Sequence, residues 1–282
     1  LSSTAHAWLT ANDAGAISVD ILRKFTGAGA TVTLAVRDVQ VGAVAAAHIA
    51  AVTGRSRPQV RPLDLADPSS IAAFATGWDV PLDLLVNNAG LVTAGLLRSI
   101  AGWELQLATN HLGHFALSLG LHAHLAAAAA AHGQARVVAL SSTAHMRAPV
   151  ELDDLHFHRR PYDPQIAYAQ SKTASSLFAV EASRQWQSDG ITVNAVNPGG
   201  VRTGLQRHFS DEQKRSLDAA EAAGIFAYKT PQQGAATTLV ACVAPELAGI
   251  GGRYLDDCRE AYPVPDDATL AQHPHGVKQW AL

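Results

Sequence analysis

The sequence has few of the residues that build disulfide frameworks, metal centres or nucleic-acid surfaces. Only two of its 282 residues are cysteine, Cys242 and Cys258, which is typical of a reduced, cytoplasmic protein. Its 13 histidines show neither HExxH nor Cys/His ligand spacing, so we expect no metal site and interpret pairs such as His111 and His114 as packing or surface residues. Charged residues make up 16% of the chain and the net charge is -3. With no basic stripe, nucleic acid is not an expected partner.

Long hydrophobic runs are also missing. The longest apolar stretch, Phe115 to Ala131, is alanine-rich and is interrupted by His122 and His124, so it is too weak for a membrane span. We therefore expect no membrane partner and no signal peptide. What the chain does have is 48% apolar residues, enough for the core of one large α/β unit.

Short β-branched runs alternate with helical segments. We predict strands at Thr31–Val36, Val60–Asp64, Leu82–Asn87, Arg136–Ser141 and Ile191–Val196, after a first strand that leads into Leu9–Asp20. The predicted helices are Ala16–Thr26, Val39–Ala51, Ser69–Thr76, Trp103–Ala131 and Gln165–Asp189. This alternation predicts an α/β fold, a doubly wound, Rossmann-like parallel sheet flanked by helices, in a single domain over 1–282. Within it, 200–229 should form a flap at the substrate, with a helical His208–Ala223, and the tail from Pro263 should be irregular.

Tyr168 and Lys172 lie four residues apart in a predicted helix and so share one of its faces. A nearby cation stabilises a phenolate, so we expect Lys172 to lower the pKa of Tyr168 from its ordinary value of about 10. A tyrosine tuned in this way can donate or accept a proton during a reaction. Ser141-Ser142 ends a predicted strand, and ligands of doubly wound sheets bind at the carboxyl ends of the strands. We therefore expect this serine pair to lie near Tyr168.

Polar and glycine residues follow the other predicted strands as well. They are Arg37-Asp38, Asp64-Leu65, Asn87-Asn88-Ala89-Gly90 and Asn197-Pro198-Gly199-Gly200. Each segment alone is ordinary turn chemistry. Their recurrence at consecutive strand ends predicts one binding site along that edge of the sheet.

These segments together resemble the short-chain dehydrogenase/reductase family, from about Thr31 to Asp257. NNAG stands at Asn87–Gly90, and the family's active-site residues match Asn110, Ser142, Tyr168 and Lys172. Three segments are most similar to the retinol-dehydrogenase-like actinobacterial members: Leu152–Leu155, Ala167–Lys172 and Gly251–Tyr254.

The resemblance implies an NADP-dependent oxidoreductase that interconverts a carbonyl and an alcohol on a small lipophilic or secondary-metabolite substrate. Tyr168 would transfer the proton, Lys172 would assist it and hold the nicotinamide ribose, Ser142 would bind the reacting oxygen, and Asn110 would anchor a water. The substrate would contact Ser142, Tyr168 and His145. The implied cofactor-binding residues are Asn12, Ile17, Arg37, Asp64, Leu65, Asn88, Ala89, Gly90, Tyr168, Lys172, Pro198, Gly199 and Thr203. Arg37 favours NADP over NAD, since a cation there can meet the adenosine phosphate, although Asp38 opposes this.

The sequence departs from the family between the first strand and the first helix. Members carry TGxxxGxG there, whereas Leu9–Asp20 (LTANDAGAISVD) contains one glycine, Gly15. A gapless count puts the three glycine positions at Asn12, Ala16 and Ser18, and one inserted residue instead aligns Thr10-Ala11 with TG. Added Cβ atoms and the charge of Asp13 would weaken pyrophosphate binding. We therefore expect NADP binding to be weak or absent.

Two other hypotheses stay open. An eroded loop beside an intact active-site set suits an enzyme that has lost hydride transfer. Such an enzyme would use Tyr168, Ser142 and Lys172 for a cofactor-independent cyclisation, dehydration or isomerisation in secondary metabolism. A binding or regulatory pseudoenzyme is disfavoured by the complete set. The charge-poor helices Trp103–Ala131 and Gln165–Asp189 further suggest a homodimer or homotetramer.

Overall fold

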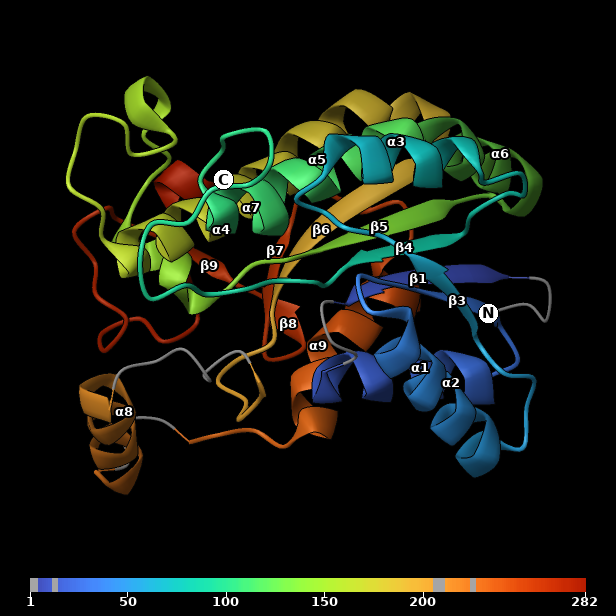
Figure 1. Ribbon diagram of the computed structural model, residues 1–282, viewed down its shortest axis with the longest axis horizontal. Coiled ribbons are helices and arrows are strands. Elements are labelled where there is room, and N and C mark those ends of the chain that lie inside the picture. Colours follow the sequence, from blue (N-terminus) through green and yellow to red (C-terminus); the bar gives the residue numbers. More distant parts are fainter. Residues whose placement is uncertain (1–4, 12–14, 205–210, 224–226) are drawn as a thin grey trace.

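One sheet organises the molecule (Figure 1). The computed structural model describes residues 5–11, 15–204, 211–223 and 227–282. Its strands are β1 (His6–Ala11), β2 (Thr31–Val36), β3 (Gln59–Pro62), β4 (Leu84–Asn87), β5 (Ala135–Leu140), β6 (Ile191–Asn197), β7 (Tyr254–Asp256) and β8 (Arg259–Glu260). They lie in the order β3-β2-β1-β4-β5-β6-β7-β8, parallel as far as β7, with β8 antiparallel. The predicted doubly wound α/β fold is confirmed.

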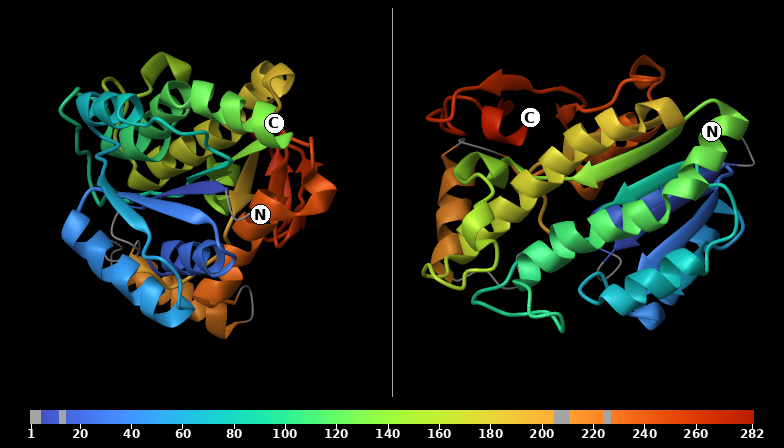
Figure 2. Two further views of the ribbon diagram at one scale, coloured as in Figure 1. Left: turned by 90° about the vertical axis from the view of Figure 1, so that its right-hand side faces the viewer. Right: turned by 90° about the horizontal axis from the view of Figure 1, so that it is seen from above.

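Helices cover both faces of this sheet (Figures 1 and 2). One face carries α1 (Ala16–Gly27), α2 (Val39–Thr53) and α9 (Pro231–Val243). The other carries α3 (Pro68–Thr76), α5 (Gly113–Gly120), α6 (His122–His132) and α7 (Pro164–Trp186). β5 shows why its sequence is mainly apolar: Val137 and Ala139 enter one core, and Val138 and Leu140 enter the other. A strand buried on both faces favours apolar residues on both, and the exception, Arg136, donates to Ala241 O and Ala244 O.

The strand order reverses between β1 and β4, which are hydrogen-bonded neighbours. From this junction β2 and β3 continue to one side, and β5, β6 and β7 continue to the other. Crossover connections therefore leave the junction in opposite directions, and a crevice opens beyond the carboxyl ends of the two strands. The segments that follow β1 and β4 form its walls.

The prediction of one helix over Trp103–Ala131 is wrong. The segment contains α4 (Leu105–Leu107), a π-helical turn at Ala108–Leu112, α5 and α6, and its two halves, Leu105–Gly120 and His122–His132, are bent by 57°. Leu121 at the bend is buried and has left helical geometry, with φ -100 and ψ 0. Among the described residues, no single helix has the length and hydropathy to cross a membrane, although this bent pair meets both criteria when taken together.

Other predicted elements agree to within a few residues, and the carboxyl-terminal part differs. α9, β7 and β8 were not predicted, and the tail is not wholly irregular. Its strand β9 (Tyr262–Val264) pairs in parallel with β10 (Gly276–Lys278), ahead of a 3-10 turn at Gln279–Ala281. The expected helix within His208–Ala223 is confirmed as α8 (Asp211–Ala222), with 208–210 outside the described residues. That 200–229 covers a substrate stays a prediction.

Candidate active site

A cavity of about 160 Å³ lies at the crevice between β1 and β4. Its walls come from the first turn of α1, the segment after β4, the end of β5, α7 and the turn after β6. Eight of the residues predicted to bind cofactor line it: Ile17, Asn88, Ala89, Gly90, Tyr168, Lys172, Pro198 and Thr203. Strand ends that are far apart in the sequence therefore meet at one cavity.

α7 carries Tyr168 and Lys172. It begins where Asp163 caps the backbone N–H groups of Gln165 and Ile166, so Tyr168 lies just beyond its first turn. The ammonium Nζ of Lys172 lies 5.6 Å from the centroid of the Tyr168 ring. It donates a hydrogen bond of 2.9 Å to the carbonyl oxygen of Leu140, at the end of β5.

The expectation that the pKa of Tyr168 lies below its ordinary value is wrong for this arrangement, because burial outweighs any effect of Lys172. Burial raises the pKa of Tyr168 to about 12, and a hydrogen bond with Ser142 opposes that rise. Burial likewise lowers the pKa of Lys172 to about 8. Desolvation disfavours both charged forms, and the ammonium is directed to a carbonyl oxygen. Tyr168 is therefore a protonated phenol at neutral pH, beside Ser142.

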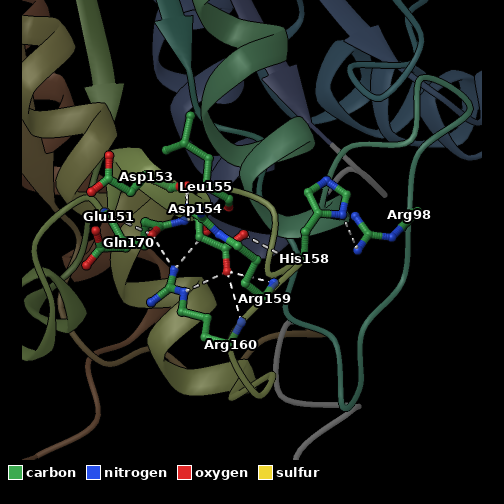
Figure 3. A network of polar contacts seen from close by, with 9 residues as sticks. All are labelled: Arg98, Glu151, Asp153, Asp154, Leu155, His158, Arg159, Arg160 and Gln170. Atoms are coloured by element: carbon green, nitrogen blue, oxygen red, sulfur yellow. Dashed lines mark hydrogen bonds and ion pairs between the residues drawn. The ribbon is translucent and has the colours of Figure 1, made fainter.

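The loop before α7 is pinned to that helix (Figure 3). The carboxylate of Asp154 accepts hydrogen bonds from the backbone N–H groups of His158, Arg159 and Arg160, at 2.8, 3.1 and 3.1 Å. Burial raises the pKa of Asp154, but these bonds outweigh it and lower the pKa to about 2. The Arg160 side chain then donates to Gln170 Oε1 at 2.8 Å. Since Gln170 follows Tyr168 by two residues, the network holds the start of α7 in place.

Asn110 lies in the π-helical turn and is almost fully buried. Its side chain accepts from Leu91 N at 2.8 Å and donates to Leu91 O at 3.1 Å and to Ser171 Oγ at 3.0 Å. A Cβ built on Gly90 would lie 3.4 Å from Lys172 Nζ and 3.5 Å from Asn110 Oδ1. Asn110 thus joins the segment after β4 to α7 beside Lys172. Its role in holding a water stays a prediction.

Asn88 ties together the two described ends of the loop between β1 and α1. Its side-chain Nδ2 donates to Ser18 Oγ at 2.7 Å and to Thr10 O at 3.2 Å. Thr10 Oγ1 accepts from the backbone N–H groups of Asn88 and Ala89 at 2.9 and 3.1 Å. α1 starts after Gly15, which has no side chain to cap it, so the N–H groups of its first turn are available to an anion. Asn12 and Asp13 lie outside the described residues.

Sequence reasoning missed His114, which connects this loop to Asn110. Thr10 Oγ1 already accepts two N–H groups, and of the two acceptors within reach of its own proton, His114 Nε2 at 2.8 Å is closer than Val86 O at 3.4 Å. The other ring nitrogen, Nδ1, then carries a proton and donates to Asn110 O at 3.0 Å. Burial lowers the pKa of His114 to about 3, which keeps the ring neutral. The signal that could have predicted this contact is the position of His114, four residues after Asn110 and so on the same helical face.

Several predicted residues lie away from the cavity. Arg37 follows β2 and is exposed, and Asp38 caps α2 by accepting from Gln40 N and Val41 N. Asp64 and Leu65 follow β3, where Asp64 Oδ1 accepts from Ala66 N at 2.9 Å. Gly199 is at φ +79 in the turn after β6. These positions share the carboxyl edge of the sheet without lining the cavity.

His145 does not line the cavity, and its expected contact with substrate is not supported. The residue is fully buried. Its ring nitrogens lie 2.7 Å from Ser142 O, 3.1 Å from the Tyr254 hydroxyl and 3.4 Å from Lys278 N. Because both nitrogens have protein partners, the ring faces the core rather than the cavity.

Comparison with known proteins agrees with this geometry. The sequence profile of the short chain dehydrogenase family matches residues 6–214. The chain belongs to the short-chain dehydrogenase/reductase family. It is therefore an enzyme and an oxidoreductase, whose substrate the family membership leaves unspecified.

Relatives from several sources share the family. A protein of Streptomyces antibioticus named probable oxidoreductase is 45% identical over 285 residues, which cover 99% of this chain and 93% of that protein. Retinol dehydrogenase 13 of Homo sapiens is 36% identical over 243 residues, 84% of this chain and 72% of that protein. The solved NADP active-site complex of Pseudomonas aeruginosa RhlG has the same fold, with a TM-score of 0.72, 24% identity, and coverage of 89% of this chain and 94% of that one.

Proposed function

We propose that this enzyme uses NADP to interconvert a carbonyl and an alcohol on a small lipophilic substrate. The observation that carries the proposal is the pairing of Ser142 with the phenol of Tyr168, which lines a cavity that also includes Lys172 and the start of α1. The name of the relative retinol dehydrogenase 13 supports a lipophilic substrate, and the NADP complex of RhlG supports the cofactor.

The cavity has features that suit a dinucleotide. No side chain among the described residues caps the first turn of α1, so its N–H groups can bind a pyrophosphate. Ile17 packs towards α9, since a Cβ built on Gly234 would come within 3.3 Å of Ile17 Cδ1. Part of the Ile17 side chain therefore lies against α9 and leaves room in the cavity. The residues that would hold NADP are the first turn of α1 for the pyrophosphate, Arg37 for the adenosine phosphate, Lys172 for the nicotinamide ribose, and Pro198 and Thr203 for the nicotinamide. When bound, NADP supplies or accepts the hydride.

The chain's own residues handle the proton. With a pKa of about 12, the Tyr168 phenol is a proton donor at neutral pH and suits protonation of a carbonyl oxygen. The Ser142 hydroxyl can hold that oxygen and stabilise its developing charge. The Lys172 ammonium, charged below about pH 8, favours departure of the phenolic proton. These roles favour carbonyl reduction at neutral pH.

Titration with NADPH, followed by assays with retinal and other apolar aldehydes and ketones, tests the proposal. We expect saturable binding with a Kd below about 1 mM, a free energy of roughly 4 kcal/mol or more. Tyr168→Phe should retain this binding and lose activity by about a hundredfold or more, because only the transferable proton is removed. Absence of binding at millimolar NADPH, or undiminished turnover by Tyr168→Phe, would overturn the proposal. The cofactor-independent alternative predicts turnover without NADPH, and no feature of the described site favours it.

A further inference from the structure

The tail that begins with β9 folds back onto the side of the molecule that carries Ser142. Its terminal turn, marked C in Figures 1 and 2, lies beside α7. Val264, Val277 and Ala281 are buried, with at most 2% of each side chain exposed. Lys278 is buried as well, and its Nζ donates to the carbonyl oxygen of Asp266, within the tail. The tail is thus part of the core and has its own internal contacts.

Two groups of the tail hold His145. The backbone N–H of Lys278 donates to His145 Nε2 at 3.4 Å, and the indole Nε1–H of Trp280 donates to the His145 carbonyl oxygen at 3.1 Å. More than 130 residues separate each pair in the sequence. The tail therefore fixes both the ring and the backbone of a residue that belongs to the turn after β5.

This contact fits the tautomer of His145 that the Ser142 carbonyl oxygen requires, because that oxygen can only accept a hydrogen bond. Nε2 accepts from Lys278, so Nδ1 is the protonated nitrogen and donates to Ser142 O at 2.7 Å. The backbone N–H of His145 donates to the same oxygen at 3.1 Å. Burial lowers the pKa of His145. The ring therefore stays neutral, with its proton on Nδ1. Ser142 is therefore held from behind by a donor whose direction depends on the tail.

A second contact of the tail reaches a wall of the cavity. His275 Nδ1 donates to Asp256 Oδ2 at 2.8 Å, and Asp256 Oδ1 accepts from Asn197 Nδ2 at 2.9 Å. Asn197 Oδ1 in turn accepts from Gly199 N at 3.1 Å. This chain fixes the turn around Pro198, which lines the cavity. Two separate parts of the tail thus support the turn that carries Ser142 and the turn around Pro198.

We propose that the carboxyl-terminal tail is an internal brace for the active site, and that His145 is the positioning residue through which it orients Ser142. That the tail holds the turn after β5 is a statement about structure and does not depend on the reaction. Only its effect on turnover rests on the proposed function.

Trp280→Phe tests the brace because it removes the indole donor to His145 and keeps an aromatic ring. Trp78→Phe is a matched control: Trp78 Nε1 also donates to a backbone carbonyl, that of Val80, but it packs against His6 at the amino end of β1, away from the cavity. Amide hydrogen exchange of the peptide covering 139–148 gives a readout that needs no activity. Steady-state kinetics then separate kcat from the KM for NADPH.

We expect faster exchange over 139–148 in Trp280→Phe and wild-type exchange there in Trp78→Phe.

His145→Leu should lower kcat by about tenfold, the cost of one misplaced buried hydrogen bond, and leave the KM for NADPH unchanged. His145→Asn, whose amide N–H can replace Nδ1–H, should recover most of that loss. Wild-type exchange in Trp280→Phe, or equal kcat losses in His145→Asn and His145→Leu, would overturn the brace. If the wild-type enzyme reduces no carbonyl, the proposed function fails, and the exchange data still decide the brace.

Discussion

Tyr168 and Lys172 share one face of α7, and burial moves their pKa values apart, to about 12 and about 8. The spacing of the two residues predicted that they would meet. It could not predict that Lys172 would donate to Leu140 O, because that bond depends on where β5 ends relative to α7. At the scale of single residues, desolvation therefore governs the protonation states of the site, and the lysine is the group closer to titrating in the neutral range.

The pH dependence of reduction follows from Lys172. Its folded pKa is lowered to about 8, so its charge is present below that pH and is lost above it. We expect kcat for carbonyl reduction, measured at saturating NADPH, to fall as the pH rises through about 8, since the uncharged amine no longer assists Tyr168. Lys172→Arg keeps its charge in alkaline solution, so the fall should move to higher pH. The same alkaline limb in both proteins would exclude Lys172 as its origin.

At the scale of elements, strand ends were the predictable part of the site. Apolar runs followed by polar or turn-forming residues located β2 and β4 to β6 to within about two residues, and parallel pairing then brought their ends together. The continuous helical pattern of Trp103–Ala131 gave no sign of its bend, because Leu121 leaves helical geometry through its burial in the core. The orientation of His145 was equally hidden, since its partners lie in the tail.

The contact between α1 and α9 yields a prediction at this scale. A Cβ added at Gly234 would lie 2.5 Å from Val201 Cγ2 and 3.3 Å from Ile17 Cδ1, so Gly234→Ala should displace Ile17 towards the cavity. We expect NADPH affinity to fall by about tenfold, within the range of 1–3 kcal/mol for overpacking. Gly27→Ala is the control, because its Cβ would meet only Thr53 Cγ2, at 3.9 Å. Calorimetric titration that gives equal affinities for both variants would contradict this account of Ile17.

At the scale of the whole molecule, buried neutral histidine links stability to acidity. His114 takes up a proton near pH 3 in the folded chain, whereas an unfolded histidine does so near about 6.5. A depressed folded pKa means that stability is fully present above about 6.5 and is lost as the pH falls below it. The free energy of unfolding should drop by up to about 1.4 kcal/mol per pH unit from this group.

Denaturant unfolding at several values between about pH 7 and about pH 4 measures this slope. His114→Gln should flatten it, because the group that takes up the proton on unfolding is gone. His48→Gln, at an exposed position on α2, should leave the slope unchanged. Parallel slopes for wild type and His114→Gln would show that acid sensitivity arises elsewhere in the chain.

The burial of Ala281, next to the indole that contacts His145, also has a practical side. An affinity tag or a surface tether attached after Leu282 would pull on the residues that brace Ser142. Attachment at an exposed position of α2, such as His48, avoids that strain, so enzyme immobilised at these two places should differ in turnover while retaining the same substrate preference.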